Sequence, residues 1–75
     1  MNMLEILKEI SSGRVKHNTI IEPFNKNEST LIYSYNTLFY YFNDHEENET
    51  YEVKVEDLLI MIESNHKYYI VEEVI

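Results

Sequence analysis

The sequence has no cysteine, no tryptophan, and only one glycine and one proline among its 75 residues. The absence of cysteine excludes disulfides and thiolate metal sites, so packing alone must hold the interior, and a reducing cytoplasm is the natural setting. No apolar run approaches the roughly 20 residues that cross a bilayer, and the N-terminal residues lack the pattern of a signal peptide. We therefore predict a cytoplasmic protein that makes no membrane contact.

Basic residues are also scarce, with six Lys and Arg against 14 Asp and Glu, which gives a net charge of −8. Residues 1–27 carry a net charge of +1, whereas residues 28–75 carry −9. A protein this acidic is repelled by DNA and by anionic membranes, so direct binding to nucleic acid is not expected. The charge fits a protein that binds a protein partner.

The length of 75 residues allows one domain, which we place at residues 1–75. A chain of this size buries only about 60% of the surface that its unfolded form exposes, so the core is thin. Marginal stability or homo-oligomerisation is the expected consequence.

Aromatic residues are concentrated in one stretch, Leu31–Phe42, which holds six of the ten Tyr and Phe residues. Tyr, Phe and β-branched residues fit a pleated, half-buried surface, so this stretch is predicted to form a hairpin at the sheet centre. We place its turn at Asn36-Thr37. Because both faces of the hairpin carry bulky side chains and one helix covers one face, the second face is predicted to be an interface.

The N-terminal segment is predicted to form an amphipathic helix. Asn2 is placed to cap it, Glu5 completes a capping box three residues later, and Gly13 suits a left-handed C-terminal turn. The apolar positions at helical spacing are Met3, Leu4, Ile6, Leu7 and Ile10.

Short extended segments account for most of the remaining sequence. Residues 14–24 are predicted to contain an edge strand or two short strands, because Pro23 lacks a backbone donor. Residues 51–55 alternate as a strand, and residues 68–75 suit a last strand. Between them, a short helix is predicted from residue 56 to near Asn65, with strand as the alternative for 58–62. The predicted fold is α+β, with the N-terminal helix packed on a mainly antiparallel β-meander and a short second helix before the last strand.

The sequence shows no catalytic constellation, so we predict that the protein is not an enzyme. The three histidines, at 17, 45 and 66, are far apart, and neither a nucleophile elbow nor a Gly-rich phosphate loop is present. Asp44, Glu46 and Asn48 have the spacing of the first calcium ligands of an EF-hand loop, but Glu49 and Val55 stand where Gly and Glu are required. No metal ion or cofactor is expected.

Two groups of charged residues are candidate binding sites. Arg14, Lys16 and His17 form the one local concentration of positive charge, which suits a phosphate or nucleotide or is simply a solvated edge strand. The acidic group suits mimicry of nucleic-acid phosphates in the basic groove of a protein partner, or is a solvated loop. The acidic candidates are Asp44, Glu46, Glu47, Glu49 and Glu52.

The layout of the chain resembles the small phage-encoded anti-defence proteins of the Thoeris nucleotide-sponge type. The resemblance rests on the opening MLEILKEISSGRV, on LIYSYNTLFYYF, on YEVKVEDLL and on the ending YYIVEE. It implies a non-enzymatic oligomer in the host cytoplasm that sequesters a cyclic nucleotide immune signal, with Arg14, Lys16, Tyr33 and Tyr35 as ligand contacts. The alternative is an acidic, nucleic-acid-mimicking inhibitor of a host defence nuclease, of the anti-CRISPR or anti-restriction type, that acts by protein–protein binding.

Overall fold

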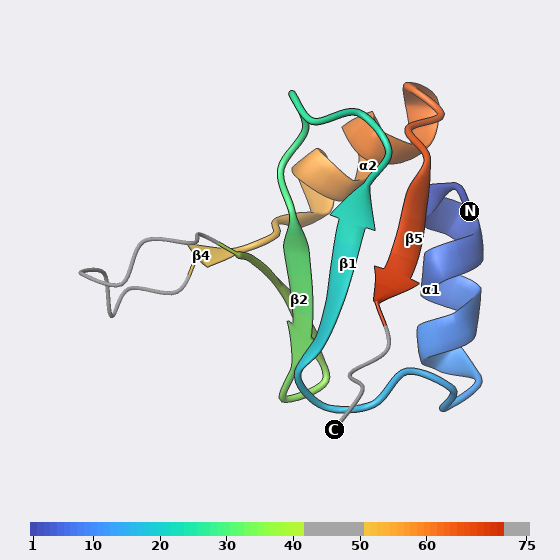
Figure 1. Cartoon of the computed structure of the whole chain (residues 1–75), viewed down its shortest axis with the longest axis vertical. Helices are drawn as coiled ribbons and strands as arrows, with labels where there is room; N and C mark the ends of the chain where they lie inside the picture. The colour runs from blue at the N-terminus through green and yellow to red at the C-terminus, as the bar shows by residue number, and fades with distance from the viewer. Residues whose placement is uncertain (42–50, 72–75) are drawn as a thin grey trace.

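The structure, a computed structural model, describes residues 1–41 and 51–71 and has an α+β fold (Figure 1). The order of elements agrees with the prediction of helix, strand, hairpin, strand, helix and strand. The predictions that fall on Phe42, on the acidic residues 43–50 and on residues 72–75 lie outside the described residues. The elements are α1 (Met3–Ser11), β1 (Thr19–Pro23), β2 (Leu31–Ser34), β3 (Thr37–Tyr40), β4 (Tyr51–Glu52), α2 (Val55–Glu63) and β5 (Tyr68–Val71).

The strands form one antiparallel sheet in the order β4-β3-β2-β1-β5. Strands β1 to β4 follow one another as a meander, and β5 returns to pair with β1 on the far side. β2, the first strand of the aromatic stretch, is therefore the middle strand, which confirms the prediction that this stretch forms the sheet centre.

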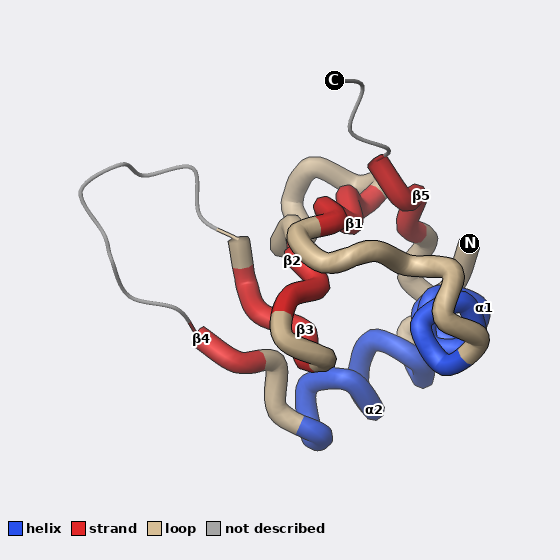
Figure 2. Tube along the Cα trace, turned by 90° about the horizontal axis from the view of Figure 1, so that it is seen from below, coloured by secondary structure: helices blue, strands red, loops and turns tan. Residues whose placement is uncertain are grey.

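Both helices pack on the same face of the sheet, as Figure 2 shows, and the predicted packing of the N-terminal helix is confirmed. Apolar side chains line this face because cross-strand partners point to the same side of the sheet. Leu31, for example, lies between Ile21 of β1 and Tyr40 of β3. The buried core cluster consists of Met3, Ile6, Ile21, Leu31, Leu38, Val53 and Tyr68.

The predicted position of the hairpin turn is wrong by one residue. The turn consists of Tyr35 and Asn36, whose φ angles are 50° and 61°, and Ser34 pairs with Thr37 to close it. Two consecutive positive φ angles match the twist of a two-residue hairpin loop, and β-branched Thr37 is poorly suited to that conformation. Thr37 therefore begins β3, and the turn lies before it.

The predicted edge strand is also wrong, because β1 lies inside the sheet between β2 and β5. Pro23 is tolerated there since it is the last residue of the strand, opposite Tyr68. The next backbone N–H, that of Phe24, donates to the Lys67 carbonyl at 2.9 Å and continues the pairing.

The strand predicted at residues 51–55 is shorter than expected. β4 ends at Glu52, and α2 begins at Val55, so residues 58–62 are helical. Val53, the residue after β4, is buried in the core. Its N–H donates to the Leu38 carbonyl at 2.9 Å. Acidic residues in the first turn of α2 favour helix initiation at this point.

The ends of α1 are formed as the sequence predicts. The Asn2 side chain accepts from the Glu5 N–H at 2.9 Å, and the Asn2 N–H donates back to Glu5 Oε1 at 3.0 Å. At the other end, Gly13 has a φ of 75° and donates to the Ile10 carbonyl, while Arg14 donates to that of Glu9. These two bonds form a Schellman motif, which satisfies carbonyls of the last turn.

Replacing Asn2 with alanine is expected to lower the free energy of unfolding by about 1 kcal/mol, because a first-turn N–H loses its acceptor. Urea unfolding followed by circular dichroism measures this loss. Asn2→Ser is the control, since serine is an equally good capping residue. Equal destabilisation by both substitutions would show that the cap is not the cause.

Candidate functional site

The loop that carries the predicted basic residues lies against the β2–β3 turn at one end of the sheet, at the bottom of Figure 1. The Tyr35 N–H donates to His17 Nδ1 at 3.3 Å, and the Asn18 N–H donates to the Tyr33 carbonyl at 2.8 Å. The Ser34 hydroxyl donates to Asn18 Oδ1 at 3.1 Å. The fold thus brings residues 14–18 and 33–36 together, although the basic residues lie in a loop rather than in a strand.

The four predicted ligand contacts differ in how they are placed at this end. Arg14 Nε lies 2.5 Å from Glu9 Oε2, so its charge is engaged within the chain. Tyr33 packs against the core, and its hydroxyl donates to Asn36 Oδ1 at 3.2 Å. Lys16 is exposed, and Tyr35 is 80% exposed beside the His17 ring, whose centroid is 4.8 Å away. Two of the four side chains are therefore held by contacts within the chain, and two are exposed.

Of the predicted acidic group, Glu52 is the member within the described residues. It is exposed in β4, opposite Phe39 of β3. The other members, Asp44, Glu46, Glu47 and Glu49, lie outside the described residues.

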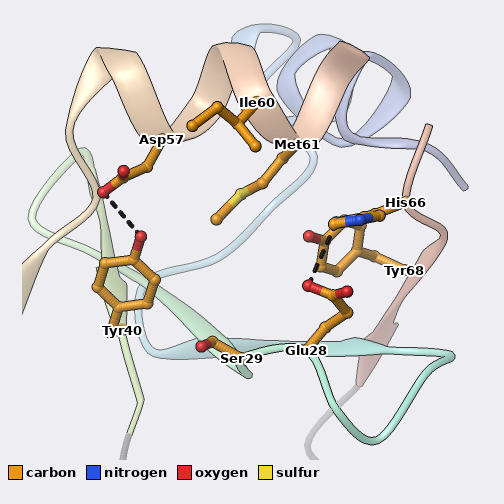
Figure 3. Close-up of a pocket in the computed structure, with 8 residues that line it drawn as sticks. All are labelled: Glu28, Ser29, Tyr40, Asp57, Ile60, Met61, His66 and Tyr68. Carbon is orange, nitrogen blue, oxygen red and sulfur yellow. Dashed lines mark hydrogen bonds and ion pairs between the residues drawn. The ribbon is translucent and has the colours of Figure 1, made fainter. Parts of the chain in front are cut away.

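A pocket that sequence reasoning missed lies between α2 and the opposite end of the sheet, with a volume of about 190 Å³ (Figure 3). Four separate segments build it, so no local sequence pattern could have indicated it. Its lining residues are Glu28, Ser29, Tyr40, Asp57, Ile60, Met61, His66 and Tyr68.

Two pairs of polar groups face each other in this pocket. The Tyr40 hydroxyl donates to Asp57 Oδ2 at 2.9 Å, which joins β3 to the first turn of α2. His66 Nδ1 lies 3.3 Å from Glu28 Oε2 but outside hydrogen-bond geometry, so this buried nitrogen has no hydrogen-bond partner among the described residues. The pair is an ion pair only when His66 is protonated.

The tyrosine hydroxyls of the pocket are held neutral. Burial, and then the hydrogen bond to Asp57, raises the pKa of Tyr40 to about 12. Burial, and then the charge of Glu28, raises the pKa of Tyr68. The two tyrosines therefore add no charge to the pocket at neutral pH, and its anionic side chains are Glu28 and Asp57.

The raised pKa of Tyr40 predicts loss of stability in alkali. The unfolded chain releases this proton near pH 10, so the contribution of neutral Tyr40 is complete below pH 10 and declines as the pH rises toward 12. Two pKa units correspond to at most about 2.7 kcal/mol, and the partial exposure of Tyr40 lowers this value. Urea unfolding between pH 9 and 11.5 should show a shallower decline for Tyr40→Phe than for the wild type. Equal slopes would contradict the assignment.

α2 presents apolar side chains on its outer side, although none of its residues is buried. Val55, Leu59 and Ile60, which we call the α2 surface, are 70%, 53% and 57% exposed. The opposite side of the helix packs on the core through Leu58, Met61 and Ile62. A sequence signal for this surface did exist, since the five consecutive apolar residues 58–62 exceed what one buried helix face requires.

Comparison with protein-family models gave no match, and comparisons with curated proteins and solved structures gave no significant match. None of the described helices combines the length and the apolar character that crossing a membrane requires.

Proposed function

We propose that this chain is a non-catalytic binding protein that attaches to a basic protein partner through the α2 surface. The exposure of Val55, Leu59 and Ile60 carries the proposal. Exposed aliphatic side chains that gather on one helix mark interaction sites more often than isolated ones do. An amphipathic contact of this kind needs no chemistry from the site, which agrees with the absence of a catalytic motif in the sequence.

Charge favours a basic partner over a second copy of the chain. Glu56 and Glu63 are exposed on α2 beside the apolar residues, and the chain has a net charge of −8. Two copies that meet through this surface bring like charges together, whereas a basic surface gains steering and affinity. The acidic-inhibitor function therefore has more support than self-association through α2.

Sequestration of a nucleotide has less support. Arg14 is exposed but paired with Glu9, and Tyr33 packs on the core, so Lys16 and Tyr35 are the better-placed candidates at that end. An anti-defence role, with a host defence protein as the partner, remains the biological setting that the sequence resemblance proposes.

The test compares Leu59→Ala with Leu4→Ala, an equally conservative change at an exposed leucine of α1. A partner captured by the wild-type chain is identified, and its affinity is measured by calorimetry at two salt concentrations. We expect Leu59→Ala to weaken binding by about 10-fold or more, as truncation of a central interface residue does, and Leu4→Ala to leave it unchanged. Affinity should also fall as salt rises.

The proposal fails if Leu59→Ala leaves the affinity unchanged. It also fails if sedimentation shows a homodimer that Leu59→Ala dissociates, because the α2 surface then binds a second copy.

A further inference from the structure

The pocket between α2 and the end of the sheet adjoins the α2 surface. Ile60 belongs to both, since it lines the pocket and is 57% exposed. Ser29 on the opposite wall is exposed as well. A group carried by a partner seated on α2 therefore reaches the pocket directly.

The lining of the pocket selects for positive charge. Its eight residues include the carboxylates of Glu28 and Asp57 and neither lysine nor arginine. The Tyr40 hydroxyl donates a hydrogen bond to Asp57, which holds that carboxylate at the wall of the pocket. His66 Nδ1 lies beside Glu28 without a hydrogen bond to it. An entering cation donates charge-assisted hydrogen bonds to these two carboxylates, in addition to the bond that Asp57 accepts from Tyr40.

The rest of the lining suits an aliphatic stem. The side chain of Met61 extends from α2 into the space between Tyr40 and Tyr68 (Figure 3). Thioether, alkyl and ring surfaces pack against methylene groups, and a tyrosine ring face attracts a cation. The volume of about 190 Å³ is below the range of about 300–1,000 Å³ that holds drug-sized molecules. A single side chain fits this size, and a nucleotide does not.

We infer that this pocket binds the cationic end of a lysine or arginine side chain, with Glu28 and Asp57 as the anionic contacts and Met61 against the stem. The inference rests on the proposed function in one respect: the lysine or arginine is assumed to belong to the basic partner that binds the α2 surface. The ligand chemistry itself, an ammonium or guanidinium group on an alkyl chain, follows from the pocket alone.

The test titrates the isotope-labelled full chain with N-acetyl-lysine methylamide and, separately, with N-acetyl-arginine methylamide, followed by NMR. We expect saturable shifts at the amides of Glu28, Tyr40, Asp57 and Met61 with either or both compounds, and the tighter binder identifies the side chain. N-acetyl-norleucine methylamide, which keeps the stem and lacks the charge, should bind at least 5-fold more weakly.

Charge-neutralising variants separate the pocket from the general acidity of the protein. Glu28→Gln and Asp57→Asn should each weaken binding of the better analogue by at least 5-fold, whereas Glu56→Gln, on the same helix outside the pocket, should leave it unchanged. The NMR spectrum of each variant without ligand reports whether the variant is folded. If one of the two pocket variants does not fold, the other is sufficient for the test. Equal binding of the norleucine compound, equal loss in all three variants, or no saturable shift would overturn the inference.

The two proposals fail separately. If Leu59→Ala releases the partner while Glu28→Gln and Asp57→Asn retain it at wild-type affinity, the pocket inference is wrong and the proposed function stands. If the analogues bind as expected while Leu59→Ala does not affect the partner, the pocket stands and the α2 proposal is wrong.

Discussion

Replacing Leu31 with alanine is expected to lower the free energy of unfolding by about 3 kcal/mol. Leu31 is 0% exposed in the middle strand and lies between Ile21 and Tyr40. The neighbouring strands and both helices fix the walls of the resulting cavity, so the site cannot collapse to fill it. Domains of this size have total stabilities near the low end of about 5–15 kcal/mol, so a measurable fraction of the variant should be unfolded at 25 °C.

The control is Ile32→Ala, one residue along the same strand. Ile32 faces away from the helices and is half-buried, so its truncation should cost about 1 kcal/mol or less. Urea unfolding of both variants, monitored by far-UV circular dichroism, measures the difference. Equal losses would mean that the face opposite the helices is covered in solution, which contradicts a core confined to one face.

Replacing Tyr68 with alanine is expected to be the most destabilising single change, with a loss of about 4 kcal/mol. Tyr68 is 1% exposed and is among the largest fully buried side chains. It joins β5, the core and the wall of the pocket. Removing its ring leaves a cavity that adjoins the pocket, and α1 loses support on β5.

Tyr68→Phe distinguishes the ring from the hydroxyl. Phenylalanine keeps the packing of the ring, so the loss should be about 1 kcal/mol or less, far below that of Tyr68→Ala. Calorimetric melting of the two variants beside the wild type provides the comparison. If Tyr68→Phe costs as much as Tyr68→Ala, polar contacts of the hydroxyl rather than packing hold β5 in place.

The features that the sequence predicts correctly are local ones. The cap at Asn2, the apolar periodicity of α1 and the left-handed Gly13 each depend on residues within one or two turns. The hairpin at the sheet centre also comes from adjacent segments, and alternation in residues 31–34 indicates it directly. Local preference and tertiary structure agree at these positions, so the prediction succeeds.

The features that the sequence predicts wrongly depend on distant partners. Pro23 favoured an edge strand, but β5 pairs with β1 from far along the chain and leaves the proline at the strand end. The helix α2 begins at Val55, one residue before the predicted start, and Val53 is buried in the core instead of continuing the strand. Neither partner can be identified from the residues that flank Pro23 or Val53.

The candidate sites follow the same division. The proximity of the basic loop to the β2–β3 turn was not predictable, since it depends on hydrogen bonds from Tyr35 to His17 and from Asn18 to Tyr33. The pocket draws Glu28, Tyr40, Asp57 and Tyr68 from separate elements. By contrast, the excess apolar residues of α2 were visible in the sequence as a run too long for one face.

The pairing of the first and last described segments has a consequence for the order of folding. Met1 and Tyr68 exchange backbone hydrogen bonds across 67 residues of sequence, and β5 completes the sheet beside β1. Such distant contacts carry a large loop-closure entropy, so we expect folding to be slower than in a helical protein of equal length. During synthesis, α1 is made first yet must wait for β5 before its buried side is covered. We therefore expect Met3 and Ile6 to stay uncovered until β5 has been synthesised.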